Sequence, residues 1–148
     1  MPMYLHSCVV IELVVLCLIG QWSQNLLFLP TGYGKSPLFQ LLPGICRALN
    51  TMGYMSYPKK AIILVICPLN ALIESHMKEL RQRSISCACL SGNDADQDGA
   101  YNDDYSFFFA NPEALVLNEK WRKTIQTPVY QTNLFGIVAD EVHVIPKW

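Results

Sequence analysis

The sequence predicts one α/β domain whose largely parallel sheet is covered by helices on both faces. Short apolar runs alternate along the chain with longer segments of helical spacing, which is the pattern of repeated βαβ units. Residues 61–67 form a continuous β-branched run, typical of a strand buried on both faces. Only 16% of the 148 residues are charged and 51% are hydrophobic, as burial of both sheet faces requires.

The N-terminal third is predicted to hold a helix, a strand and a second helix. Residues 8–19 are apolar apart from Glu12, and no Lys or Arg precedes them. This run is shorter than the roughly 20 residues of a membrane span and lacks the basic start of a secretory signal. We therefore expect an amphipathic or core helix there. Residues 25–29 read as a buried strand that Pro30 stops, and residues 35–49 as a helix.

The rest of the chain continues the alternation. Residues 61–67 are expected to form a strand, and residues 69–83 a helix with one apolar stripe. His76 on that helix has no partner at metal-ligand spacing and is expected to be an ordinary surface or cap residue. Further strands are predicted at 85–90, 105–110 and 134–139, with a helix or two short turns at 112–123.

Charge and cysteine usage limit the class of protein. The formal net charge of −1 excludes a strongly basic nucleic-acid-binding surface in bulk. None of the six cysteines forms a C-x-x-C pair, so we expect reduced thiols in an intracellular protein. Cys87 and Cys89 alternate along an expected strand and should therefore face the same side.

The segment Leu29-Pro-Thr-Gly-Tyr-Gly-Lys-Ser36 lies between a predicted strand and a predicted helix, the context of a phosphate-binding P-loop. Its two glycines allow backbone N–H groups to face phosphate oxygens at the helix start. Lys35 would reach the outer phosphates, and the Ser36 hydroxyl would bind Mg²⁺. Leu29 stands where the general motif has glycine, and Pro37 offers no backbone N–H. The predicted ligands of this loop are phosphate groups and Mg²⁺.

Two adjacent carboxylates, Asp140 and Glu141, follow the last apolar strand. Ligands of open parallel sheets bind beyond the carboxyl ends of the strands, so both carboxylates are expected beside the phosphates. Asp140 would belong to the Mg²⁺ shell, and Glu141 would polarise the water that attacks the terminal phosphate.

These motifs, taken in order, resemble the first motor lobe of RecQ-type superfamily 2 DNA helicases. The resemblance runs from about residue 25 to the end of the chain. It implies a RecA-like fold, ATP hydrolysis with Mg²⁺, and 3′-to-5′ DNA unwinding by the complete enzyme. Asn70, Asn111 and Val142 depart from the residues that the family usually has. The motifs are residues 29–36 followed by Phe39-Gln40, then Cys67-Pro-Leu-Asn-Ala-Leu72, Asn111-Pro-Glu-Ala-Leu115, and Asp140-Glu-Val-His143 with Trp148.

The resemblance also implies roles for single residues. ATP would be bound together with Mg²⁺ by the residues of the phosphate loop, namely Thr31, Gly32, Tyr33, Gly34, Lys35 and Ser36. Lys35, Glu141 and His143 would act in catalysis, with His143 coupling the ATP site to DNA and to a second lobe. Two further segments would lie beside the DNA strand. They comprise Pro68, Leu69, Asn70 and Ala71, and Asn111, Pro112 and Glu113.

The same comparison suggests how the chain is organised. Residues 1–24 are expected to be a divergent helical segment, and residues 25–148 part of a helicase ATP-binding domain. In the family a further strand lies between the phosphate-loop strand and the Asp-Glu strand, and a second RecA-like lobe follows. Without them, strands 26–29 and 135–139 would share no neighbour. We therefore expect a fragment that is inactive alone.

The partner of the complete enzyme would be DNA at a junction of single and double strands, with no membrane involved. The location implied is the nucleus, on chromosomes, with the cytoplasm as the alternative. A non-catalytic nucleotide- or nucleic-acid-binding remnant of a helicase gene is the competing interpretation.

Overall fold

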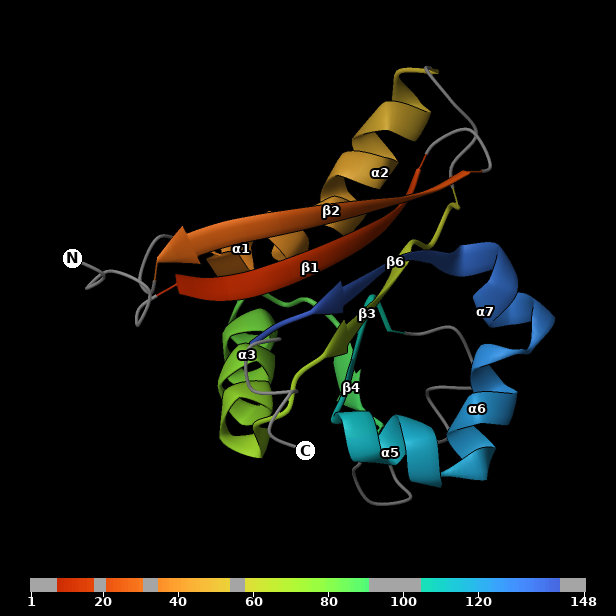
Figure 1. Cartoon of the computed structure of the whole chain (residues 1–148). Coiled ribbons are helices and arrows are strands. Elements are labelled where there is room, and N and C mark those ends of the chain that lie inside the picture. The colour runs from red at the N-terminus through yellow and green to blue at the C-terminus, as the bar shows by residue number, and fades with distance from the viewer. Residues whose placement is uncertain (1–7, 18–20, 31–34, 54–57, 91–104, 142–148) are drawn as a thin grey trace.

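The computed structural model describes residues 8–17, 21–30, 35–53, 58–90 and 105–141; in β1, β2 and at Lys35 this description covers the backbone (Figure 1). Helices and strands alternate through most of the chain. The elements are β1 (Cys8–Cys17), β2 (Gln21–Pro30), α1 (Lys35–Gln40), α2 (Leu42–Thr51), β3 (Ile62–Ile66), α3 (Asn70–Gln82), β4 (Cys87–Cys89), β5 (Phe107–Ala110), α5 (Pro112–Leu117), α6 (Glu119–Ile125), α7 (Pro128–Asn133) and β6 (Leu134–Ala139).

The six strands form one sheet in the order β2-β1-β6-β3-β5-β4. Strands β6, β3, β5 and β4 pair in parallel. Strand β1 pairs antiparallel with both β2 and β6, so β2 runs in the same direction as β6. The predicted fold class, an α/β lobe with a mostly parallel sheet flanked by helices, is confirmed.

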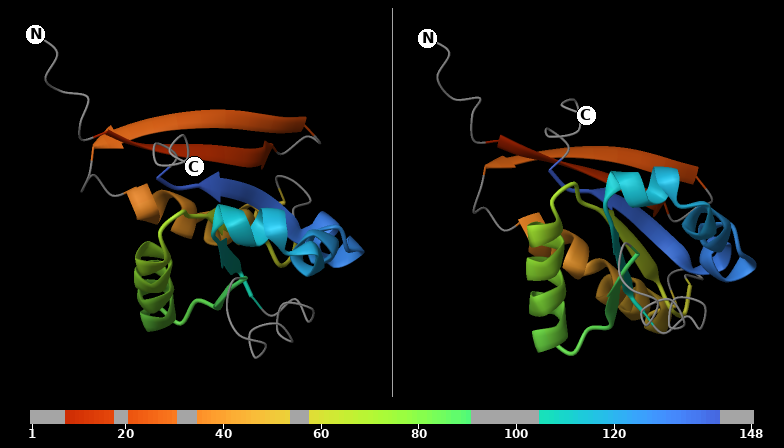
Figure 2. Two further views of the ribbon diagram at one scale, coloured as in Figure 1. Left: turned by 60° about the horizontal axis from the view of Figure 1, so that its bottom comes forward. Right: turned by 90° about the horizontal axis from the view of Figure 1, so that it is seen from below.

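Helices cover both faces of the sheet, as the low charge content predicts. Ile63 and Val65 of β3 belong to a core shared with α1, α2 and α3. Ile62 and Leu64 point the other way, into a core that contains Trp121 of α6. Figure 2 shows α3 and the run of α5 to α7 on opposite sides of the strands. This alternation of buried faces explains why β3 is apolar at every position.

Most predicted elements are confirmed, with shifted ends. The helix expected over 35–49 is two helices separated by a turn at Leu41, and α2 ends close to Gly53, which has a positive φ of 72°. The segment expected at 112–123 as a helix or two short turns consists of two short helices, α5 and α6, and α6 continues to Ile125. The strands expected at 85–90 and 105–110 are shorter than predicted. Helix α7, at Pro128–Asn133, was not predicted.

The helix predicted over residues 8–19 is wrong, because Cys8–Cys17 is strand β1. Val and Ile dominate this segment, and their branched side chains favour a pleated backbone. Its backbone is paired on both sides at Glu12, which lies opposite Leu26 of β2 and Ala139 of β6. The length of this apolar run does not distinguish a helix from a strand. Its pairing with two neighbouring strands does.

The expectation that β2 and β6 would share no neighbour is also wrong. Strand β1 lies between them and pairs with both. The expected domain boundary between residues 24 and 25 falls inside β2, and the division into two parts stays a prediction. In Figure 1 the β1–β2 hairpin, drawn in red and orange, forms one end of the sheet.

Candidate nucleotide site

Four strands end at one edge of the sheet and bring the predicted motifs to it. Strands β2, β3, β5 and β6 run in the same direction, so their carboxyl ends share this edge. The chain leaves it after Pro30 toward α1, after Ile66 toward α3, after Ala110 toward α5, and after Ala139 into Asp140. In open parallel sheets this is the edge where ligands bind.

The predicted phosphate-binding residues divide between described and undescribed parts of the chain. Lys35 and Ser36 are the first two residues of α1, and Ser36 is half-buried. Pro37 follows in the first turn, where a missing N–H leaves no helical hydrogen bond unmade. Residues 31–34 and His143 lie outside the described residues.

The strand register shows that the strand before the phosphate loop and the strand before Asp140 end at different positions along the sheet. Ala139 of β6 and Leu26 of β2 both lie opposite Glu12 of β1. Strand β2 continues to Pro30, so it extends beyond β6 at this edge. The end of β2 is therefore four residues further along the register than the end of β6.

Asp140 is buried, with 5% of its surface exposed, and both of its carboxylate oxygens have partners. Oδ2 lies 3.3 Å from Nε2 of His76, and Oδ1 accepts a 3.0 Å hydrogen bond from the backbone N–H of Glu141. Its own backbone N–H donates to the carbonyl of Ile66, which extends the β6–β3 pairing by one residue. This network fixes the carboxylate at the end of β6.

Glu141 occupies an unusual backbone conformation. Its φ is 58°, in the left-handed region that residues with a Cβ rarely adopt. Such a conformation costs about 1–2 kcal/mol and persists where surrounding contacts impose it. The N–H bond to the Asp140 carboxylate is one such contact. Backbone strain of this kind gathers at functional sites, which supports a functional role for this turn.

The two segments predicted to lie beside DNA are neighbours in the structure. Asn111 Nδ2 donates a 3.4 Å hydrogen bond to Asn70 Oδ1. The Asn111 side chain also caps α5, because its Oδ1 accepts from the N–H of Ala114 at 2.7 Å. A side-chain cap of this kind stabilises a helix start by about 1 kcal/mol. The two asparagines therefore already have structural partners.

The other members of these segments differ in exposure. Leu69, Ala71 and Glu113 are exposed, Pro112 is half-buried, and Pro68 is buried. Pro68 therefore shapes the turn into α3 and presents little surface to a ligand.

Sequence reasoning missed His76. It was expected on the surface, but only 8% of it is exposed and its ring contacts Asp140. A signal was present in the spacing: His76 stands three residues after Ile73 and four before Leu80, on the apolar stripe of α3. Position on this stripe predicts burial, and a buried imidazole needs a polar partner.

Cys67 lies beside the carboxylates at the end of β3. Burial, together with the smaller effect of the negative charges of Asp140 and Glu141, raises the pKa of its thiol to about 11. Its Sγ donates to the Leu69 carbonyl at 3.7 Å. Cys46, Cys67, Cys87 and Cys89 are free thiols, and Cys87 and Cys89 pack with the same core, as predicted.

The donor set at this edge suits Mg²⁺. The Ser36 hydroxyl and the Asp140 carboxylate are oxygen ligands, which Mg²⁺ prefers. Within the described residues no three His, Cys, Asp or Glu side chains gather to form an all-protein metal cage. Mg²⁺ commonly binds through one or two carboxylates together with substrate phosphates, so these residues fit a nucleotide-bound ion.

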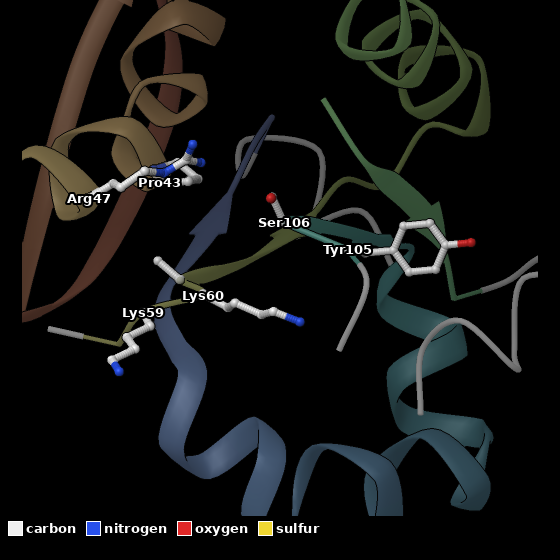
Figure 3. Close-up of a pocket in the computed structure, with 7 residues that line it drawn as sticks. Pro43, Arg47, Lys59, Lys60, Tyr105 and Ser106 are labelled. Carbon is white, nitrogen blue, oxygen red and sulfur yellow. The ribbon is translucent and has the colours of Figure 1, made fainter. Parts of the chain in front are cut away.

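A separate pocket of about 260 Å³ lies at the opposite edge of the sheet, where β3 and β5 begin. Figure 3 shows that Lys59 and Lys60 at its rim point in different directions. This basic rim therefore does not converge on one ligand position. The lining residues are Pro43, Arg47, Lys59, Lys60, Ala61, Tyr105 and Ser106.

Of the helices that the structure describes, none combines the length and apolar character of a membrane span.

The fold and this edge define a P-loop type α/β lobe. A family model described as "DEAD/DEAH box helicase" matches residues 13–148. The chain belongs to this family.

Several curated relatives are named as ATP-dependent DNA helicases RecQ or Q1, which confirms the resemblance found in the motifs. The ATP-dependent DNA helicase RecQ of Synechocystis sp. is 30% identical over 141 residues, covering 91% of this chain and 26% of the relative. The ATP-dependent DNA helicase Q1 of Mus musculus is 26% identical over 130 residues, covering 82% of this chain and 18% of the relative. The chain thus spans about a quarter of these relatives or less. No solved structure gives a significant match.

Proposed function

We propose that this chain is the ATP-binding lobe of an ATP-dependent DNA helicase of RecQ type, which unwinds DNA in the 3′-to-5′ direction. One observation carries the proposal. The strand that leads into the Gly-rich segment and the strand that ends in Asp140 run in the same direction and end at one sheet edge, in a chain of the DEAD/DEAH box helicase family. The DNA substrate and the direction of unwinding rest on the RecQ-type relatives.

Each residue at this edge has a chemical task in ATP hydrolysis. Lys35 binds the outer phosphates, and Ser36 and Asp140 hold Mg²⁺, which neutralises charge on those phosphates when bound. Glu141 orients the attacking water and accepts its proton. The partner of the complete protein is DNA on the chromosome, in the nucleus of a eukaryotic cell.

Two further roles follow from the resemblance. His143 couples nucleotide hydrolysis to DNA. Of residues 68–71 and 111–113, Pro68 is buried and supports the turn, and the others contact the DNA strand. The hydrogen bond between Asn70 and Asn111 supports a common surface for both segments.

The test is a titration of residues 1–148 with a fluorescent ATP analogue in the presence of Mg²⁺. Lys35 is the sole Lys or Arg before Arg47, so Lys35→Ala removes the one lysine of the predicted phosphate loop. A charge-assisted hydrogen bond contributes about 1.5–3 kcal/mol, so affinity should fall roughly tenfold or more. Lys59→Ala, at the opposite edge, is the matched control and should bind normally. Equal affinity of Lys35→Ala and the unaltered chain would refute the proposal.

A further inference from the structure

His76 lies at the meeting point of three elements near the candidate site. It belongs to α3, and its ring stacks on Phe109 of β5 with a centroid distance of 5.9 Å and an interplanar angle of 11°. On another side Phe39 of α1 meets the ring edge-on, with centroids 5.7 Å apart and an interplanar angle of 78°. Two aromatic contacts at different angles hold the imidazole in one orientation.

The polar edge of this ring faces Asp140. Nε2 lies 3.3 Å from Oδ2, and both residues are buried. An ionised carboxylate can only accept hydrogen bonds, so Nε2 carries the hydrogen in this contact. With Oδ1 bonded to the Glu141 N–H, the carboxylate plane is fixed from both ends. Each oxygen keeps a further lone pair for a ligand, because a carboxylate offers about four acceptor sites.

Side chains of α1 contact α3 and so support the position of His76. One turn further along α3, Glu79 accepts a hydrogen bond from Gln40 at 3.3 Å. Arg83 donates to Gln40 at 3.2 Å and to Glu79 at 2.6 Å. Thus α1, which begins with Lys35 and Ser36, packs on α3 through Phe39 and Gln40. Helix α3 then reaches Asp140 through His76.

We propose that His76 is a positioning residue that holds the Asp140 carboxylate in the orientation required for Mg²⁺ bound with nucleotide. The proposal rests on the proposed function, since it concerns the same edge of the sheet. His76 does not touch the nucleotide or the metal ion. Hydrogen-bond partners behind a metal-binding carboxylate matter: their loss commonly lowers metal affinity by about 10–100-fold.

The experiment compares nucleotide affinity of residues 1–148 in Mg²⁺ and in EDTA, and the ratio of the two affinities is the Mg²⁺ effect. In His76→Ala we expect this ratio to fall about tenfold or more toward the value of Asp140→Asn, while affinity in EDTA stays unchanged. His76→Gln should restore most of the ratio, because its amide N–H reaches a similar position to Nε2. Met77→Leu is the control, a volume-conserving change at the next buried residue of α3.

The double variant His76→Ala/Asp140→Asn separates positioning from general stability. If His76 acts through Asp140, the double variant should lose no more of the Mg²⁺ effect than Asp140→Asn alone. Additive losses would overturn the proposal, and so would an unchanged or larger Mg²⁺ effect in His76→Ala. Failure of the proposed function looks different: Lys35→Ala would then bind as the unaltered chain does, and the positioning role would fall with it.

Discussion

Pro37 is the residue whose chemistry fits the predicted nucleotide site least. It lies in the first turn of α1, directly after Ser36, and it is exposed. Its nitrogen cannot donate to a phosphate. Pro37→Leu restores an N–H and should tighten ATP binding about tenfold or more, since a hydrogen bond to a charged group contributes roughly 1.5–3 kcal/mol. Calorimetry with ATP tests this, with adenosine as the control because it has no phosphate. Equal or weaker ATP binding would show that this amide is not used.

Cys67 should be an unreactive thiol until strongly alkaline pH. Burial and the nearby Asp140 and Glu141 raise its pKa to about 11, so the thiolate is on the order of a hundredfold scarcer at pH 8 than for an ordinary cysteine. Because the pKa is raised, the rate of alkylation should keep rising with pH through pH 10. Mass spectrometry after timed iodoacetamide treatment measures this, with the partly exposed Cys89 as the internal reference. A rate that levels off near pH 9 would contradict the raised pKa.

The sequence correctly places Asp140 and Glu141 directly after the last strand, whereas its expectation of a surface position for His76 is wrong. Two carboxylates after an apolar strand end are visible in the sequence because they break an apolar pattern. His76 was missed because its partner lies 64 residues away along the chain. Contacts of that separation depend on sheet order and helix placement, which local spacing does not encode. The left-handed backbone of Glu141 also has no sequence signal, because glutamate rarely adopts this conformation.

At the scale of elements, the C-terminal end of α3 has a capping motif in which the residue type is not the one that best suits the backbone conformation. The N–H of Ser84 bonds to the Arg81 carbonyl and the N–H of Ile85 to the Leu80 carbonyl, which together form a Schellman motif. Ser84 adopts a φ of 57° there, although glycine is the residue that usually takes this position. Ile85 and Leu80 also pack in the same core. The geometry is thus maintained by its neighbours against a local preference.

Ser84→Gly should therefore stabilise the protein. Removing the Cβ relieves about 1–2 kcal/mol of left-handed strain, which the greater freedom of glycine in the unfolded chain partly offsets. We expect a net gain of up to about 1 kcal/mol, seen as a higher urea midpoint at an unchanged slope. Ser84→Ala keeps the Cβ and should give no such gain. A lower midpoint for Ser84→Gly would mean that the serine side chain contributes more than the strain costs.

Helices and strands were predictable where the spacing of apolar residues matches the faces that are buried in the structure. β3 is buried on both faces, and α3 has one apolar stripe, so periodicity identified both. Periodicity did not identify β1, because a run that is apolar at every position except Glu12 shows no clear period and can be buried as a helix or as a strand. Its pairing with β2 and β6 shows that the run is a strand and not a helix.

At the scale of the whole molecule, β1 connects the phosphate-loop strand to the rest of the sheet. It pairs with β2 along its full length and with β6 over Glu12–Val15. In the order β2-β1-β6, no other strand joins β2 to the sheet that carries Asp140. The two halves of the candidate site therefore depend on β1 for their relative position, although β1 contains none of the predicted site residues.

Removing residues 1–17 should consequently abolish nucleotide binding and expose two strand edges. Without β1, β2 has no partner strand and β6 is left as an open edge, which invites association between chains. Sedimentation should show aggregates, and the fluorescent ATP analogue should no longer bind. Removal of residues 1–7, which precede β1, is the control and should leave both properties unchanged.

A milder variant, Val14→Pro, tests the same point without deletion. Val14 lies opposite both Gln24 of β2 and Ile137 of β6, so its N–H faces one of two paired neighbours. Proline removes that donor, and within sheets it is confined to edge strands, strand starts and bulges, so it should be poorly tolerated at this doubly paired position. We expect weaker nucleotide binding and a lower urea midpoint together. If both variants stayed monomeric and bound nucleotide normally, β1 would not be the strand that links β2 to β6, and the strand order would need revision.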